Sequence, residues 1–135
     1  MRREFDLSEE DFEYLTSLAK KGQTWEAILK GQEMWVVVSD WPAPEGYNIQ
    51  SVSVAIMLPQ NYPSSEIDMA FFNPFIERKD GVGIKATDSR MNLDGKEWQR
   101  WSRHRTGDNP WRLGVDNILT HLTQVNHWLV REFVK

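Results

Sequence analysis

The pattern of hydrophobic and polar positions divides the chain into a helical start, a stretch of short strands, an aperiodic segment and a helical end. Residues 8–21 begin with Ser8 and acidic side chains, end with lysines and stop at Gly22, which is typical of a capped helix. A second helix is predicted from Asp116 onward, with Asp116 as its cap, because apolar residues recur at helical spacing. These apolar residues are Ile118, Leu119, Leu122, Val125, Trp128, Leu129 and Phe133.

Between the helices, short runs rich in Val, Ile and Trp alternate with turn residues and predict antiparallel strands. In Val52–Leu58, apolar side chains at every second position indicate one buried sheet face and one partly solvated face. The predicted fold is therefore α+β, with an N-terminal helix, a four-stranded antiparallel meander and a C-terminal helix. The four predicted strands are Thr24–Leu29, Met34–Val38, Val52–Leu58 and Ile67–Phe72.

The segment from Asn73 to Leu113 has little periodicity of either kind and contains prolines, glycines and many charges. Loops of this length in compact domains are usually functional or hold short structure of their own, so we expect a long active-site-type loop. Three of the seven tryptophans, Trp98, Trp101 and Trp111, fall within it. Aromatic side chains gathered in a loop anchor it or bind a partner, and Trp101 and Trp111 are the binding candidates.

Composition narrows the class of protein. The 135 residues are 40% hydrophobic and 27% charged, which fits one domain over residues 1–135. A net charge of -4 without a basic run argues against binding to nucleic acid. No window has the apolar length of a membrane span or the apolar core of a signal peptide. We therefore expect a soluble cytoplasmic protein without nucleic-acid or membrane partners.

The chain contains no cysteine, which excludes a disulfide framework, a thiolate zinc site and a cysteine nucleophile. His121 and His127 lie six positions apart on the predicted second helix and point to different faces, whereas a two-histidine metal motif needs a spacing near four. We expect neither a metal ion nor a cofactor.

Several motifs carry a resemblance to a known family. The stretch VAIMLPQNYPSSEIDMAFF ends a strand with a proline, turns through Tyr62 and Pro63, and resumes as a strand, and Trp111 lies ahead of a capped amphipathic helix. In this order the sequence resembles the ubiquitin-conjugating enzyme superfamily. The string LDGKEWQRWSRHRTGDNPWRLGVDNILTHL is similar to the prokaryotic ubiquitin-conjugating family E. The resemblance covers essentially the whole chain, without the usual C-terminal helices, and Tyr62 and Pro63 have a structural role in the turn.

The resemblance implies transfer of a ubiquitin-like protein, delivered by an activating-enzyme homologue, to a target amine, in a bacterial pathway for which antiphage defence is one setting. In familiar members a cysteine holds the modifier as a thioester, with a nearby asparagine or backbone amides stabilising the oxyanion. This chain lacks both the cysteine and the His-Pro-Asn string of the family. Neither the usual nucleophile nor the usual oxyanion donor carries over.

The position of the family's cysteine in this sequence depends on which motif the residues are counted from. Counting forward from the Tyr-Pro turn places it near Ala86 and Thr87, so that Ala86 marks either a natural loss or a laboratory substitution. Counting backward from Trp111 places it near Ser102 and His104, two residues apart. Side chains at this spacing share one side of an extended segment, so His104 would act as a base on the Ser102 hydroxyl to allow an oxyester.

Charged residues surround these candidates. Arg103 and Arg105 are expected to stabilise developing negative charge or to receive a modifier's C-terminal carboxylate. Asp108 or Asp94 would have to fold back to orient the imidazole of His104. Otherwise, the arginines are solvated or pair with acidic side chains. The arginines are Arg100, Arg103, Arg105 and Arg112, and the acids are Asp88, Asp94, Glu97 and Asp108.

Three functions follow in order of preference. The first is a ubiquitin-conjugating-like carrier without a cysteine, and the second is a non-catalytic binding module of the same fold that positions the modifier or the activating enzyme. The third is an unrelated small α+β protein with a tryptophan-lined pocket, which requires a fold without the Tyr-Pro turn beside the long loop.

Overall fold

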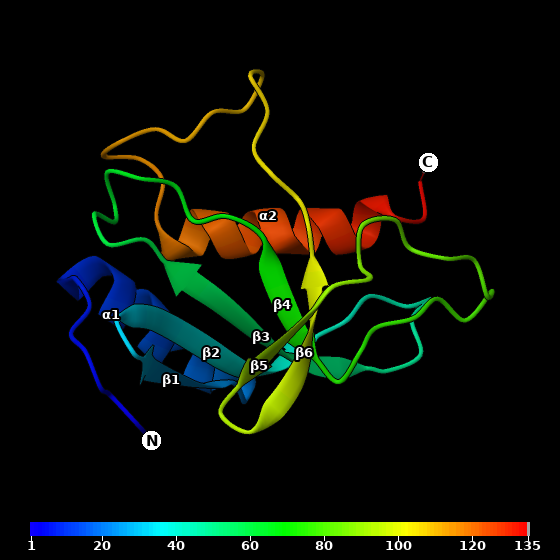
Figure 1. The fold of residues 1–135 in the computed structure, drawn as a ribbon, viewed down its shortest axis with the longest axis horizontal. Helices are drawn as coiled ribbons and strands as arrows, with labels where there is room; N and C mark the ends of the chain where they lie inside the picture. The colour runs from blue at the N-terminus through cyan, green and yellow to red at the C-terminus, as the bar shows by residue number, and fades with distance from the viewer. Residues whose placement is uncertain (135) are drawn as a thin grey trace.

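The computed structural model describes residues 1–134, and Figure 1 shows how its elements are arranged. An N-terminal helix precedes an antiparallel sheet and a C-terminal helix, so the α+β prediction is confirmed. The elements are α1 (Glu9–Ser17), the 3₁₀ helix η1 (Leu18–Lys21), β1 (Thr24–Lys30), β2 (Glu33–Pro42), β3 (Ser51–Leu58), β4 (Ala70–Asn73), β5 (Arg90–Leu93), β6 (Lys96–Trp101) and α2 (Ile118–Arg131).

The first predicted helix forms as two consecutive segments, because α1 ends at Ser17 and η1 continues to the residue before Gly22. Ser8 caps α1 by accepting a hydrogen bond from the backbone N–H of Asp11 at 3.2 Å, and acidic residues fill the first turn, where the helix dipole favours them. The chain leaves η1 through Gly22, whose φ of 78° costs a residue with a Cβ about 1–2 kcal/mol.

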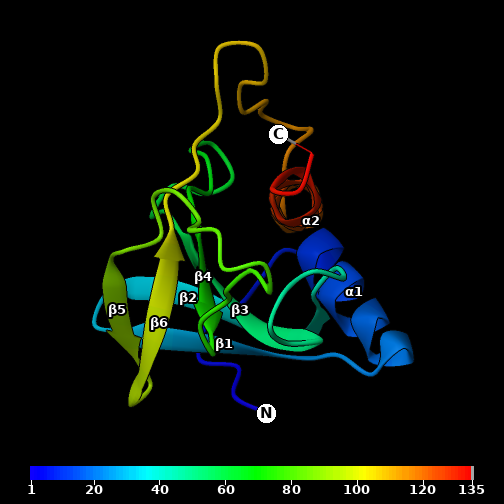
Figure 2. The same ribbon diagram turned by 90° about the vertical axis from the view of Figure 1, so that its right-hand side faces the viewer.

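The sheet has six strands in the described residues, in the order β1-β2-β3-β4-β6-β5, so the prediction of four is wrong. Every neighbouring pair is antiparallel. The sheet curls, so that the β5–β6 hairpin faces the side of the sheet formed by β1 and β2 (Figure 2). Two contacts join the hairpin to that side: Arg2 pairs with Asp94, and Lys30 donates to the carbonyl of Asn92 at 2.6 Å.

The two additional strands lie inside the segment predicted to be one long loop. Asp94 and Gly95 join β5 to β6 with φ values of 56° and 74°, the backbone of a type I′ hairpin turn. The fourth strand is shorter than predicted, because Met69 has a φ of 60° and interrupts the extended backbone between Ile67 and β4.

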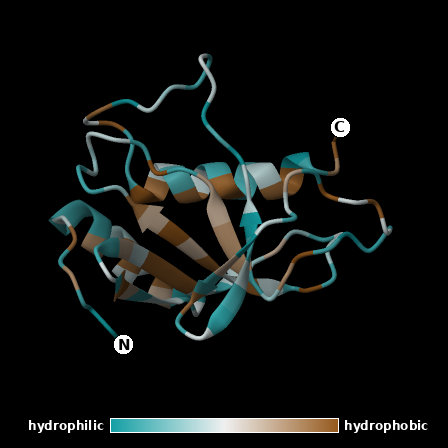
Figure 3. Ribbon diagram, in the orientation of Figure 1, coloured by the Kyte–Doolittle hydropathy of each residue, from teal (hydrophilic) through white to brown (hydrophobic). Residues whose placement is uncertain are grey.

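The two faces of the sheet contribute to separate hydrophobic clusters. Val54 and Ile56 of β3 pack with α2 residues such as Leu122 in the larger cluster, as the alternation predicts. Figure 3 shows the apolar side of α2 against the sheet. The opposite face remains partly solvated in β3, as predicted, because Ser51 is exposed and Ser53 and Met57 are only partly buried. The hairpin covers part of this face, where Leu93 and Trp98 pack with residues of β1–β4.

The observed cap of the second helix lies one residue after the predicted cap, Asp116. Asn117 caps α2: its Oδ1 accepts from Thr120 N at 3.1 Å, and its backbone N–H donates to Thr120 Oγ1 at 2.9 Å. Asp116 is buried and binds arginines, so its predicted role as the cap is wrong. Within residues 1–134, the helices are too short and too polar to cross a membrane.

Candidate functional site

The Tyr62–Pro63 turn is tied to both helices. The Tyr62 hydroxyl donates to Asp11 Oδ2 at 2.7 Å and accepts from the backbone N–H of Ile118 at 3.0 Å. Asp11 is only 2% exposed, so α1 supplies a buried carboxylate to the start of α2. Burial and the hydrogen bond to Asp11 raise the pKa of Tyr62, which keeps the phenol protonated as a donor.

Trp111 joins the segment before α2 to this turn. Its indole Nε1 donates to the carbonyl of Pro63 at 2.8 Å, and its ring lies 6.3 Å from the Tyr62 ring, centroid to centroid. The guanidinium of Arg105 lies 5.0 Å from the centre of the same indole. The Tyr-Pro turn and the downstream tryptophan, two separate motifs in the sequence, are therefore in direct contact.

Ala86 and Ser102 are neighbours in space. The backbone N–H of Ser102 donates to the carbonyl of Ala86 at 3.0 Å. Ser102 is the central residue of a three-residue turn at the end of β6, closed by Arg103 N donating to Trp101 O at 3.0 Å. Ala86 is exposed and has a φ of 58°. The two positions that the sequence counts gave as alternatives therefore belong to one place on the surface.

The Ser102 hydroxyl does not pair with His104 as the sequence spacing predicted. Ser102 Oγ accepts a hydrogen bond from Arg100 Nε at 3.1 Å, whereas His104 Nδ1 lies 2.7 Å from Asp68 Oδ1. Asp68, rather than Asp108 or Asp94, is the carboxylate that orients the imidazole, since Asp94 pairs with Arg2. The turn at Ser102 breaks the regular alternation on which the expected pairing depended.

Behind the Asp68–His104 pair lies a constrained piece of backbone. Met69 has a φ of 60°, and its N–H donates to Arg103 O at 3.2 Å. Its carbonyl accepts from Nε2 of His121 at 2.8 Å. His121 is 2% exposed, and burial is the main cause that lowers its pKa to about 4, so the imidazole is neutral near pH 7. A neutral buried histidine therefore supports the segment that presents Asp68.

A cleft of about 410 Å³ lies beside these loops. Its walls include the glycine-containing segment 81–84, and Thr87, the residue after Ala86, also lines it. The loop that forms the cleft is thus continuous with the loop that contacts Ser102. Other lining residues are Ile76, Glu77, Arg78, Asp88, Arg90 and Gln99.

A comparison with protein families matches residues 7–132 to the prokaryotic E2 family E. The chain belongs to this family. No curated protein and no solved structure matches it. Membership supports a ubiquitin-conjugating-like role in general and suggests interaction with ubiquitin-like modifiers and activating enzymes.

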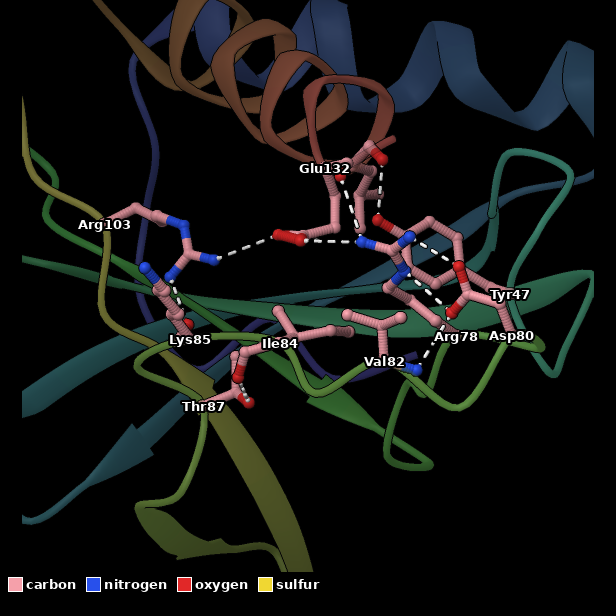
Figure 4. A network of polar contacts seen from close by, with 10 residues as sticks. Tyr47, Arg78, Asp80, Val82, Ile84, Lys85, Thr87, Arg103 and Glu132 are labelled. Carbon is pink, nitrogen blue, oxygen red and sulfur yellow. Dashed lines mark hydrogen bonds and ion pairs between the residues drawn. The ribbon is translucent and has the colours of Figure 1, made fainter. Parts of the chain in front are cut away.

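In this family member, the arginines expected to bind a ligand have internal partners. Arg103 lies 3.9 Å from Glu132 and donates to Lys85 O at 2.9 Å, and Glu132 also contacts Arg78 at 3.4 Å (Figure 4). This network connects the end of α2 to the cleft loop and the β6 end. The expected pairing of Arg103 with an acid of the long loop is therefore wrong.

Arg105 and Arg112 share one carboxylate, that of Asp116, at 3.4 and 3.7 Å. Burial acts to raise the pKa of Asp116, but the backbone N–H of Arg112 and the charges of the two arginines outweigh it and lower the pKa. Asp116 thus holds the end of the long loop, a role that the predicted acids do not fill.

Two further residues complete the account of the candidates. Trp101 is fully buried and packs edge-on against Phe72 with 5.3 Å between ring centroids, so it is a core residue and its expected binding role is wrong. Asp68 was missed by sequence reasoning because it lies in the Ile67–Phe72 run, which reads as a strand, far from His104 in sequence. Residues 1–134 contain no group of three or more His, Asp or Glu side chains arranged to hold a metal ion.

Proposed function

We propose that this protein is a carrier in the conjugation of a ubiquitin-like protein, and that it holds the C-terminus of the modifier as an oxyester on Ser102. Family membership supports the general role. The observation that carries the specific proposal is the 3.0 Å hydrogen bond from Ser102 N to Ala86 O, because it makes this serine a direct neighbour of the position that the first count assigned to the missing cysteine.

The surroundings of Ser102 favour an acyl carrier. The partly buried serine follows a strand at a turn, so its backbone is fixed while the residue keeps some exposure to solvent. The neighbouring cleft of about 410 Å³ has two glycines, Gly81 and Gly83, in its wall, which leaves room for the backbone of an extended peptide tail. In this proposal the modifier's tail lies in the cleft and its last carbonyl reaches Ser102.

His104 acts in this proposal as the base for the transfer step. Asp68 binds Nδ1, which fixes the tautomer with Nε2 as the proton acceptor when the imidazole is neutral. The His104 side chain is 60% exposed, so an incoming amine has access to it. The amine attacks the ester carbonyl and forms the C–N bond, and the C–O bond to Ser102 breaks. His104 takes the proton of the amine and returns it to the departing Ser102 oxygen, which regenerates the hydroxyl.

The test is a charging reaction with the cognate activating-enzyme homologue, the ubiquitin-like protein and ATP. We expect an adduct that hydroxylamine cleaves and thiols do not, because an ester resists mild thiol exchange. Ser102→Ala should abolish it, whereas Ser64→Ala, in the exposed turn after Pro63, is the matched control and should not. Failure to form an adduct while the activating enzyme is itself charged would contradict the carrier role.

The second candidate function is a non-catalytic module that positions the modifier or the activating enzyme. It is favoured by one observation: the Ser102 hydroxyl is bonded to Arg100, and His104 is bonded to Asp68 instead of to the hydroxyl. This function predicts stable binding to the modifier or activating enzyme, with full pathway activity in a Ser102→Ala/His104→Ala double variant. The carrier role predicts that this double variant is inactive.

A further inference from the structure

Arg100 is held in an unusual way for a cation of this chain. It lies near the end of β6, and its Nε donates to Ser102 Oγ at 3.1 Å while its Nη2 donates to Ser89 Oγ at 2.9 Å. The backbone is fixed as well, because Arg100 N donates to Ser89 O at 3.0 Å. A partly buried guanidinium is thus placed between two neutral hydroxyl groups.

The contrast with neighbouring arginines is informative. Arg78 and Arg103 pair with the carboxylate of Glu132, and Arg105 pairs with Asp116. Among the ion pairs of residues 1–134, none involves Arg100, so its positive charge is not neutralised by a protein carboxylate there. A guanidinium has five N–H donors, and the two serine bonds leave three to face an external anionic oxygen.

We propose that Arg100 is a catalytic residue that stabilises negative charge on Ser102 Oγ and on the oxyanion formed when Ser102 is acylated, with Ser89 as the residue that positions Arg100. This inference rests on the proposed carrier function. A charge-assisted hydrogen bond strengthens as its acceptor becomes negative. Arg100 therefore stabilises the transition state more than the neutral serine, which is the requirement for catalysis.

The reaction that this arrangement serves is acyl transfer from a thioester on the activating enzyme. Ser102 Oγ attacks the thioester carbonyl and forms the C–O bond, and collapse of the tetrahedral oxyanion breaks the C–S bond. The hydroxyl proton ends on the departing thiolate, which leaves as a thiol. The products are the oxyester on Ser102 and the free thiol of the activating enzyme, with no oxidant or reductant required.

The test has two arms that separate this inference from the carrier role. In the first, the charging reaction compares wild type with Arg100→Gln, and we expect about a 100-fold slower rate of adduct formation. In the second, a glycylglycine thioester of a small thiol acylates the protein without the activating enzyme, and intact mass spectrometry follows the rate, with the same expected loss. Normal charging of Arg100→Gln overturns the inference and leaves the carrier role standing.

The second arm detects the case in which the carrier function fails while the role of Arg100 holds. Acylation of Ser102 by the small thioester that depends on Arg100, without charging by the activating enzyme, supports the role of Arg100 and contradicts the carrier function. No acylation of wild type in either arm overturns both.

A Ser102→Cys variant separates chemistry from structure. A thiolate forms readily near neutral pH and needs little help from a cation, so Arg100→Gln should slow charging of Ser102→Cys by less than about tenfold. An equal loss in both backgrounds would show that Arg100 only maintains the fold.

Ser89→Thr should retain the rate because it keeps the hydroxyl, whereas Ser89→Ala should lose part of it. Identical rates for these two variants would contradict the positioning role of Ser89.

Discussion

Two corners of the molecule use hydrogen bonds for opposite purposes. In the Tyr62 corner, formed by Asp11, Tyr62, Pro63, Trp111 and Ile118, the phenol donates to a carboxylate and the indole to a carbonyl, and the phenol accepts from a backbone N–H of α2, which joins both helices to the turn. In the Ser102 corner, formed by Ala86, Ser89, Arg100, Ser102 and His104, a cation is held by hydroxyls and an imidazole stands at the surface.

The comparison teaches which residues maintain the fold and which remain available for chemistry. The polar groups of the Tyr62 corner are satisfied internally, so substitutions that remove its contacts should reduce the free energy of unfolding. The Ser102 corner keeps unused N–H donors on Arg100 and an exposed imidazole on His104. Substitutions in this corner should therefore reduce activity with little effect on stability.

Tyr62→Ala should have the largest effect on stability. It removes a ring packed against Trp111 and leaves the buried carboxylate of Asp11 without its phenol donor. We expect a loss of about 3 kcal/mol in the free energy of unfolding, measured by urea denaturation. A loss below about 1 kcal/mol would break the comparison, because the corner would then not be structural.

Protonation of His121, behind the Ser102 corner, should have an effect of similar size. Its pKa is about 4 in the folded protein against 6.5 ordinarily, so the unfolded chain binds more protons between these values. The contribution of neutral His121 to the free energy of unfolding is therefore fully present above pH 6.5. It is lost as the pH drops toward 4, by roughly 3 kcal/mol at most.

The measurement is urea denaturation of wild type and His121→Gln from pH 7 to 4. Gln keeps an N–H donor for Met69 O but does not titrate, so the variant should lose less stability over this range. Parallel curves for the two proteins would show that His121 does not titrate differently on folding.

Trp111→Phe should have a smaller effect. It keeps an aromatic ring beside Tyr62 but removes the indole N–H that donates to Pro63 O. Because Pro63 is exposed and water can replace the donor, we expect a loss of about 1 kcal/mol in thermal or urea unfolding. The rate of adduct formation should not change, and a large drop in that rate would show that the two corners are coupled.

Ser102→Ala and Ser89→Ala should have the smallest effect on stability. Each removes one hydroxyl that accepts from Arg100, and the partly buried guanidinium can bind water instead. We expect changes within about 0.5 kcal/mol. A loss above about 2 kcal/mol would mean that the Ser102 corner, like the Tyr62 corner, is part of the structural framework.

Much of the fold was predictable because local signals coincide with tertiary packing. Ser8 and Gly22 bound the first helix, and the alternation in β3 identifies its buried face. The β5–β6 hairpin was missed although Asp94–Gly95 is a hairpin signal, since strands of four and six residues with charged positions have a weak period.

The candidate site was predictable only in its location. Ser102, His104 and Ala86 were named from sequence, and the structure brings Ser102 and Ala86 together. The partner of His104 was not predictable, because Asp68 is 36 residues away in sequence. The two residues meet only because Asp68 precedes β4, His104 follows β6, and these two strands pair. The role of Arg100 depends on Ser89 lying opposite it on the neighbouring strand end, which no periodicity in either segment encodes.

The central claim is that Ser102 receives the modifier, and the most direct measurement is the site of attachment. After charging with the activating-enzyme homologue, proteolysis and mass spectrometry of the adduct should identify the modifier's C-terminal residue linked through oxygen to Ser102. Attachment to a lysine, to another hydroxyl, or to no residue while the activating enzyme is fully charged would contradict the account.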